Sequence, residues 1–202
     1  GECICGEAAA SGAVRIEQLH ELDDAERYDC QRAGFAVVSS FAISTQSRLL
    51  YEYLKTRGKR VIYLREPGAT KISEKIRDIL LDAKNQAIVC ECEMLIYMAA
   101  RAQIVGEIIL PALKAGNIVI CDRFLDSTLA YQGYGLGMSI DLIRKVGVFT
   151  TRGITPDLTL FLDLAVKHGL KHRQANLDRI EKRSVAYHLR VRRGYLKLAQ
   201  QE

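Results

Sequence analysis

Long apolar runs are missing from this sequence of 202 residues. None reaches the roughly 18–20 residues that a membrane-spanning helix needs, so we expect no membrane partner. The N-terminus lacks a basic stretch followed by an apolar one, which argues against a secretory signal. Six cysteines are too few for a disulfide scaffold in a chain of this length, so the sequence favours a reducing, cytoplasmic setting.

The cysteines also lack the spacing of a structural zinc site. Cys3 and Cys5, like Cys90 and Cys92, are separated by one residue, whereas paired zinc ligands usually stand two to four residues apart. If residues 90–92 are helical, their two thiols point to different faces of the helix. We therefore predict no zinc site.

Composition indicates one globular domain with an N-terminal appendage. Hydrophobic residues make up 49% of the chain and charged residues 26%, which is ordinary for a folded domain. Residues 1–34 are acidic and weakly patterned, so we expect an appendage whose composition allows disorder, with at most a weak helix over 14–28. The domain itself is predicted to span residues 35–202.

The net charge of +5 is unevenly distributed along the chain. Between residues 167 and 197 there are ten Lys or Arg residues, opposed only by Asp178 and Glu181. A basic segment of this kind suits a polyanion, either nucleic acid or nucleotide phosphates, and a solvated helix face explains it equally well.

Strand-like and helix-like segments alternate from residue 35 onward. Short apolar runs begin at Phe35, Arg60, Asn117 and Leu158, and segments with helical spacing separate them. This alternation predicts an α/β fold with a parallel sheet covered by helices on both faces. Ligands of such sheets lie outside the carboxyl ends of the strands, so the residues after each run are candidates for a binding site.

Charged residues follow two of these strands. Arg65 and Glu66 come after the second run, and Asp122 and Arg123 after the third. Arg77 and Arg101 lie on helices expected to point toward the same crevice. Arginine binds phosphate oxygens bidentately, so several arginines in one cleft predict a phosphomonoester ligand, although a surface ion pair explains any single one of them.

Two further side chains have features that suit a nucleobase. Tyr97 precedes Arg101 by four residues, which places both on one helix face, and an aromatic ring there could stack on a base or simply pack in the core. Gln132 offers both a donor and acceptors, as the edge of a base requires.

Six stretches between residues 35 and 199 match one known pattern. They are Arg-Glu-Pro-Gly at 65–68, Ala-Ala-Arg at 99–101, Cys-Asp-Arg-Phe-Leu-Asp-Ser-Thr-Leu-Ala-Tyr-Gln-Gly at 121–133, Pro-Asp-Leu-Thr at 156–159, Leu-Asp-Arg-Ile-Glu at 177–181 and Gly-Tyr-Leu-Lys-Leu-Ala at 194–199. On these stretches the chain resembles the bacterial thymidylate kinase (dTMP kinase) family. The resemblance implies a P-loop NTPase-like three-layer αβα fold. It also implies transfer of the γ-phosphoryl group of ATP to dTMP, with Mg²⁺ as cofactor, by a cytoplasmic homodimer.

The resemblance also assigns roles to individual residues. It implies that Arg77, Arg101 and Arg123 hold the dTMP phosphate and that Arg65, Glu66 and Pro67 shape the acceptor site. Tyr97 would stack on thymine, Ser127, Thr128 and Gln132 would contact the base, and Tyr131 would crowd the sugar. The remaining implied roles are catalysis by Asp122, Arg123 and the lid residues Arg173 and Arg179, ATP binding by Ser44, Thr45 and Gln46, and metal binding by Ser44 and Asp122.

The phosphate loop departs from the family pattern. The family's first strand leads into a glycine-rich loop ending in Gly-Lys-Ser-Thr-Gln, whereas here Val38 is followed by Ser-Ser-Phe-Ala-Ile before Ser44. The loop is about three residues short and contains neither glycine nor lysine. Backbone N–H groups and a lysine normally cradle the phosphates, so we predict impaired catalysis.

The C-terminal end also departs from the family pattern. The family continues past the Tyr-Leu-Lys-Leu-Ala segment into another strand and a closing helix. The resemblance therefore predicts a sheet of four visible strands, with the fifth missing and one edge uncovered.

Three functions remain open on the sequence alone. The first is a working dTMP kinase, and the second is a non-catalytic dTMP-binding relative, such as a pseudokinase or degenerate copy. The third, a nucleic-acid-binding protein that uses the basic C-terminal helix, is the least favoured, so we expect no nucleic-acid partner. In the family dimer, the helices around 97–113 and 139–150 would pack across a two-fold axis.

Overall fold

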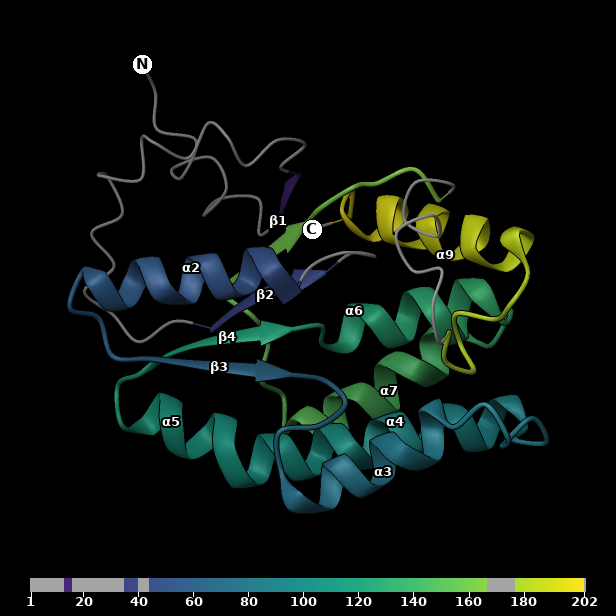
Figure 1. Cartoon of the computed structure of the whole chain (residues 1–202), viewed down its shortest axis with the longest axis horizontal. Helices are drawn as coiled ribbons and strands as arrows, with labels where there is room; N and C mark the ends of the chain where they lie inside the picture. The colour runs from purple at the N-terminus through teal and green to yellow at the C-terminus, as the bar shows by residue number, and fades with distance from the viewer. Residues whose placement is uncertain (1–12, 16–34, 40–43, 167–176, 202) are drawn as a thin grey trace.

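A five-stranded parallel sheet forms the centre of the molecule (Figure 1). The computed structural model describes residues 13–15, 35–39, 44–166 and 177–201. The strands are β1 (Ala13–Arg15), β2 (Phe35–Ser39), β3 (Val61–Arg65), β4 (Ile118–Asp122) and β5 (Leu158–Phe161), and their order across the sheet is β1-β5-β2-β4-β3. The four strands expected from the sequence are all present, within one residue at their starts.

Helices cover both faces of the sheet, as the alternation of segments predicted. They are α2 (Ser44–Thr56), α3 (Lys71–Leu81), α4 (Cys90–Ile104), η2 (Val105–Ile109), α5 (Leu110–Lys114), α6 (Leu125–Thr128), η3 (Leu129–Gly135), α7 (Ile140–Thr151) and α9 (Val185–Leu198). Figure 1 shows α2 on one face of the sheet and α3, α4, α5 and α7 on the other. The three-layer αβα class is therefore confirmed.

Strand β4 shows why the sheet needs helices on both faces. Its side chains alternate, so Ile118 and Ile120 pack with residues of α2 and β3, while Val119 and Cys121 pack with residues of α4, η2 and α5. Val119, Ile120 and Cys121 are all completely buried. A strand that is apolar on both faces is typical of the middle of a parallel sheet.

Short polar side chains begin three of the helices. Thr70, Ser139 and Ser184 accept hydrogen bonds from the backbone N–H groups of Ser73, Leu142 and Tyr187, at 3.0, 3.3 and 3.3 Å. These contacts stabilise the first turns of α3, α7 and α9, where the backbone has no partner within the helix.

The prediction of a sheet with only four strands is wrong. Strand β1 pairs in parallel with β5, with Val14 opposite Leu160, so five strands are present and the fifth comes from the N-terminal segment. An unpaired strand edge presents free N–H and C=O groups, and β1 occupies them. The weak helix expected over 14–28 is also wrong at Val14 and Arg15. Its other residues lie outside the described part of the chain.

One long helical stretch runs from Cys90 to Lys114 through α4, η2 and α5. It contains a π-helical turn just before Pro111, where the N–H of Leu110 bonds to the carbonyl of Val105, and proline lacks the N–H that a regular α-helix would use. Contrary to our expectation, its length and composition would suffice to cross a membrane. It packs as a core helix, however, with Met98, Ile104 and Ile109 buried.

Candidate nucleotide-binding site

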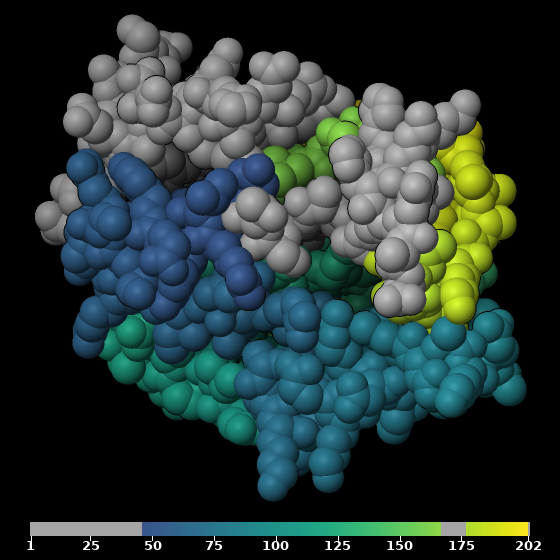
Figure 2. All heavy atoms as spheres, in the orientation of Figure 1, coloured from purple at the N-terminus to yellow at the C-terminus, as the bar shows by residue number. Residues whose placement is uncertain are grey.

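The candidate site lies at the carboxyl ends of β3 and β4. Arg65 and Asp122 are partners in the register of the two strands, and the N–H of Glu66 donates to the carbonyl of Asp122 at 2.9 Å. The parallel sheet thus brings Arg65 and Glu66 beside Asp122 and Arg123, as predicted. Figure 2 shows the surface hollowed at this end of the sheet, between the residues of α3 and those of α9.

The turn after β3 holds Arg77 in place. Gly68 has a φ of 141°, and a Cβ atom there would lie 2.5 Å from Oε1 of Glu74, so only glycine fits without displacing that carboxylate. Oε1 of Glu74 accepts the N–H of Ala69 at 2.7 Å, and Nη1 of Arg77 donates to the carbonyl of Pro67 at 2.8 Å. The Arg-Glu-Pro-Gly segment and α3 therefore form one unit.

Arg65 and Arg77 provide positive charge at this turn. Arg65 lies 3.6 Å from Oε1 of Glu74, with both side chains about half exposed. Burial lowers the pKa of Arg77, and the nearby charge of Arg65 lowers it further. The positive charges of Arg65 and Arg77 repel each other. An anion bound between them would reduce this repulsion, so the turn suits an anionic ligand.

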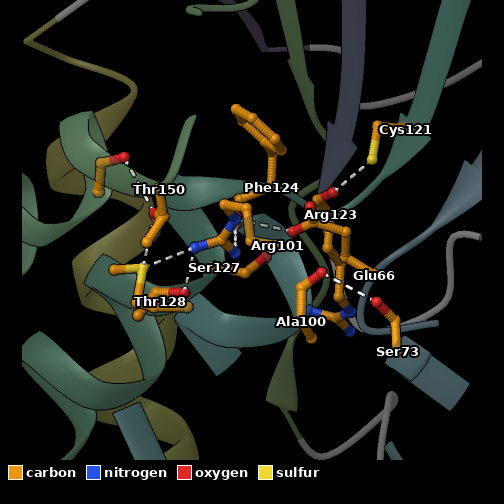
Figure 3. Close-up of polar contacts among 12 residues, drawn as sticks. Glu66, Ser73, Ala100, Arg101, Cys121, Arg123, Phe124, Ser127, Thr128 and Thr150 are labelled. Carbon is orange, nitrogen blue, oxygen red and sulfur yellow. Dashed lines mark hydrogen bonds and ion pairs between the residues drawn. The ribbon is translucent and has the colours of Figure 1, made fainter. Parts of the chain in front are cut away.

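Arg101 is the buried centre of the site (Figure 3). Its side chain is 3% exposed, and Nε donates to Oε2 of Glu66 at 2.9 Å. Nη1 donates to Oγ1 of Thr128 at 3.0 Å, and Nη2 donates to the carbonyl of Phe124 at 2.9 Å. Burial raises the pKa of Glu66, and the charge and hydrogen bond of Arg101 oppose that rise. Removing either side chain would leave the other one buried without its charged partner.

The guanidinium of Arg101 contacts groups of the protein, whereas the resemblance implied a contact with the dTMP phosphate. All three of its guanidinium nitrogens donate inside the protein, to Glu66, Thr128, the carbonyl of Phe124 and the sulfur of Met98. The arginine therefore fixes Glu66 and Thr128 relative to each other. The predicted contact of Arg101 with a phosphate stays a prediction.

Arg123 has a backbone conformation that few residues other than glycine adopt. Its φ is 73°, in the left-handed region, and the thiol of Cys121 donates to its carbonyl at 3.0 Å. Its guanidinium lies 5.3 Å from the centroid of the Tyr131 ring, and Nη1 donates to the hydroxyls of Tyr131 and Tyr195 at 3.4 and 3.3 Å. The hydroxyl of Tyr195 is also 2.7 Å from Oγ of Ser127. The structure thus brings Arg123, Ser127 and Tyr131 together.

Gln132 and Tyr97 border a buried ionic cluster. Nε2 of Gln132 donates to Oε1 of Glu93 at 2.9 Å, and both side chains are buried. Oε2 of Glu93 lies 2.6 Å from Nη2 of Arg179 and 2.6 Å from Nη2 of Arg183. Tyr97 is on the same helix as Glu93, one turn further along, and burial raises its pKa. The amide of Gln132 is therefore held by Glu93.

Arg179 occupies a supporting position in this structure. Its side chain is 5% exposed, Nε donates to the carbonyl of Leu80 at 2.8 Å, and its ion pair is with Glu93. The predicted contact with a transferring phosphate requires an exposed guanidinium, so this placement does not favour that role. Arg173, the other predicted lid residue, lies outside the described residues.

Asp122 is the candidate magnesium ligand that the structure describes. Its carboxylate is buried at the end of β4, and the hydroxyl of Tyr63 donates to Oδ2 at 3.4 Å. Burial, followed by the charge of Asp122, raises the pKa of Tyr63. Mg²⁺ prefers oxygen ligands and is often held by one or two carboxylates together with substrate phosphates, so Asp122 fits that ion. Within the described ranges, no group of three or more His, Cys, Asp or Glu side chains could hold a metal ion, zinc included.

The predicted ATP-binding residues lie at the start of α2. Ser44, Thr45 and Gln46 form its first turn directly after the altered loop, and Gln46 is half-buried. Residues 40–43 are outside the described part of the chain. The helix N-terminus is where anions bind favourably in this class of fold.

Sequence reasoning missed three side chains that organise the site. Glu93 could have been found from its helical spacing, since it precedes Tyr97 by four residues. Tyr195 lies inside the Gly-Tyr-Leu-Lys-Leu-Ala segment, but nothing local shows that it reaches Arg123. Asp163 follows β5, and its two oxygens accept from Nε and Nη2 of Arg192 at 2.7 and 2.6 Å.

The chain is similar to several known proteins. The thymidylate kinase family model matches residues 44–202. The thymidylate kinase of Thermoanaerobacter sp. is 46% identical over 169 residues, 83% of each chain, and that of Kosmotoga olearia is 47% identical over 171 residues, 84% of this chain and 82% of the relative. A crystal structure of thymidylate kinase from Ehrlichia chaffeensis has a TM-score of 0.70 and 32% identity, over 84% of this chain and 88% of its own. The chain therefore belongs to the thymidylate kinase family, whose members are phosphotransferases with a P-loop NTPase-like fold.

Proposed function

We propose that this chain binds dTMP at the carboxyl ends of β3 and β4 and transfers the γ-phosphoryl group of ATP to it, giving dTDP. The observation that carries the proposal is the pairing of β3 with β4, which places Arg65 and Glu66 beside Asp122 and Arg123. The family supplies the reaction class, and this end of the sheet would supply the acceptor site.

The charged side chains would bind the phosphate of dTMP. Arg77 and Arg123 come from separate elements at this end of the sheet, and Arg65 adds a third guanidinium. Phosphoryl transfer depends on positioning and electrostatic stabilisation, so arginines held by the protein before the substrate arrives lower the cost of ordering them.

The uncharged side chains would recognise the nucleoside. Tyr97 offers a ring for the base, and Gln132, Thr128 and Ser127 offer hydrogen-bonding groups nearby on α6 and η3. Tyr131 would restrict the space next to the sugar. Glu66 and Arg101 would act as the buried support of this half of the site.

ATP and Mg²⁺ would bind at the start of α2. Ser44, Thr45 and Gln46 form the first turn of that helix, and Asp122 provides a carboxylate at the end of β4. The ion, when bound, neutralises charge on the phosphate oxygens. Asp122 would orient it together with the nucleotide phosphates.

Catalysis would be slow, because residues 39–43 read Ser-Ser-Phe-Ala-Ile and contain neither glycine nor lysine. The family's loop uses both to hold phosphates. This observation favours a second candidate function, a dTMP-binding relative without effective kinase activity. Both candidates share the acceptor site and differ in ATP binding.

Calorimetry and a product assay on the full chain test these functions. Titration with dTMP should show saturable binding, with ATP-Mg binding weakly, and incubation with both should form dTDP and ADP slowly. Binding of dTMP without any product above background would leave the non-catalytic relative as the function. Failure to bind dTMP would contradict both.

A nucleic-acid-binding function has less support. Four arginines of the basic C-terminal region make contacts within the protein. Arg179 and Arg183 pair with Glu93, Arg190 donates to the carbonyl of Gly135 at 3.0 and 2.8 Å, and Arg192 pairs with Asp163. These contacts give part of the positive charge of residues 167–197 a role within the protein, so that charge does not require a nucleic-acid partner. We propose a cytoplasmic enzyme with nucleotides, and no nucleic acid, as its partners.

A further inference from the structure

The ring of Tyr195 is held by its neighbours. The residue belongs to the C-terminal half of α9 and is 3% exposed. Its ring stacks on Phe161 of β5 with centroids 5.1 Å apart and planes 16° apart, and it meets the edge of Tyr131 at 6.1 Å. A phenol that is packed on both sides has few orientations available, so the place of its hydroxyl is set by the core.

The hydroxyl of Tyr195 joins two residues of the proposed dTMP site. It is 3.3 Å from Nη1 of Arg123 and 2.7 Å from Oγ of Ser127. Arginine can only donate hydrogen bonds, so the phenol oxygen accepts from Arg123. Either hydroxyl can donate in the short contact with Oγ of Ser127, and the phenol carries one proton of its own. Burial raises the pKa of Tyr195, so the hydroxyl keeps that proton at ordinary pH.

The hydrogen bonds and ring contact of the Arg123 guanidinium determine where it points. The guanidinium stands at the end of a flexible stem, next to a backbone with a φ of 73°. Tyr131 contacts it by its ring and hydroxyl, but Tyr131 belongs to the proposed sugar-binding surface. Tyr195 is a partner of Arg123 that comes from α9, an element to which the proposed acceptor site assigns no other residue.

We propose that Tyr195 is a positioning residue of the acceptor site, whose hydroxyl holds the guanidinium of Arg123 toward the phosphate of dTMP. The proposal rests on the proposed binding of dTMP and adds α9 to the elements that determine it. Tyr195 acts through Arg123, so we expect its loss to affect the phosphate end of the ligand more than the nucleoside end, although its hydroxyl also contacts Ser127.

Replacement of Tyr195 by phenylalanine tests this role. Tyr195→Phe removes one oxygen atom and keeps the ring that stacks on Phe161. We expect dTMP to bind about tenfold more weakly, the loss typical of one hydrogen bond to a charged group. We expect thymidine, which lacks the phosphate, to bind as it does to the unaltered chain. Calorimetry with the two ligands measures both affinities.

A matched control comes from the neighbouring aromatic residue Tyr134. Its ring contacts α9 at Gly194 and lies 5.8 Å from the Lys197 ammonium, at a different part of the same interface. Tyr134→Phe should leave both affinities unchanged. Thymidine binding also shows whether the nucleoside part of the pocket of Tyr195→Phe is intact.

Two results would overturn the inference alone, provided that the unaltered chain binds dTMP. One is an unchanged dTMP affinity in Tyr195→Phe, and the other is an equal loss for dTMP and thymidine. An unaltered chain that does not bind dTMP would overturn the proposed function and the inference together.

Discussion

Buried carboxylates organise the candidate site at the scale of single residues. Glu66 is paired with Arg101, and Glu93 with Arg179 and Arg183, and both carboxylates are buried. A buried charge is costly unless it is paired and hydrogen-bonded, so removing one partner exposes the full cost of the other. Thr128 and Gln132, which we propose as contacts of the base, are hydrogen-bonded to members of these pairs.

Loss of the Glu93 charge should destabilise the protein. Glu93→Gln keeps the shape of the side chain but leaves two arginines without a carboxylate in the interior. We expect the free energy of unfolding to fall by about 3–5 kcal/mol, as for the removal of one partner from a buried ion pair. Urea unfolding followed by circular dichroism measures the change.

The exposed pair of Asp141 and Lys145 provides the control. Its atoms are 2.7 Å apart, but both side chains are about three-quarters exposed. Asp141→Asn should change the free energy of unfolding by less than about 0.5 kcal/mol. Similar effects of the two substitutions would show that the Glu93 cluster does not behave as a buried network.

At the scale of elements, helix α4 links several parts of the site. Glu93, Tyr97 and Arg101 follow one another at intervals of four residues, so they lie along one side of the helix. Glu93 contacts Arg179 and Arg183, Arg101 contacts Glu66 just after β3, and Tyr97 lies between them on the helix. A shift of α4 would therefore disturb the nucleoside and phosphate ends together.

At the same scale, we propose that the connection between β2 and α2 limits the reaction. Replacing residues 39–43 by a longer glycine-rich loop that ends in lysine should raise the rate of dTDP formation by at least about 100-fold. Removing a single preorganised donor costs about 10²–10³ in rate in well-studied active sites, and this change restores several donors and a cation. Chromatographic assay of dTDP and ADP at saturating substrates measures the rate.

The same loop with alanine in place of its lysine separates the two contributions. It should bind ATP-Mg better than the unaltered chain but recover much less activity than the lysine-containing loop. A lysine-containing loop that binds ATP-Mg tightly without any gain in dTDP formation would contradict the view that this connection limits catalysis.

At the scale of the whole molecule, one side carries exposed apolar side chains. Helices α4 and α7 pack on each other, and Leu95, Leu142, Val148 and Phe149 on them are about half or more exposed, with Phe149 81% exposed. Apolar surface of this kind favours association. We propose that two copies of the chain form a symmetric dimer through these helices.

A charge at Phe149 should break such a dimer. Phe149→Glu should sediment as a monomer at concentrations where the unaltered chain is a dimer, because burying an unpaired carboxylate at an interface is unfavourable. Leu49→Glu is the control, since Leu49 is 59% exposed on α2, on the other face of the sheet (Figure 1). A dimer that survives Phe149→Glu and dissociates with Leu49→Glu would place the interface elsewhere.

Local patterns were sufficient for most of the fold and for the expectation that the residues after β3 and β4 lie side by side. Four of the five strands follow from short apolar runs, because a strand buried on both faces must be apolar throughout. Strand β1 has only three residues, and it could not be predicted because its pairing with β5 joins segments more than a hundred residues apart. The same holds for the contact of Tyr195 with Arg123.

The sequence by itself determined the family, the succession of strands and helices along the chain from residue 35 onward, and the charged residues that follow β3 and β4. These depend on neighbours along the chain, where spacing and chemistry can be read directly. Only the tertiary structure decided what each guanidinium does. Arg101 and Arg179 turn inward to buried carboxylates, whereas Arg77 and Arg123 remain beside the turns that follow β3 and β4. The difference depends on which carboxylate each helix brings within reach after packing, and no local pattern contains that information.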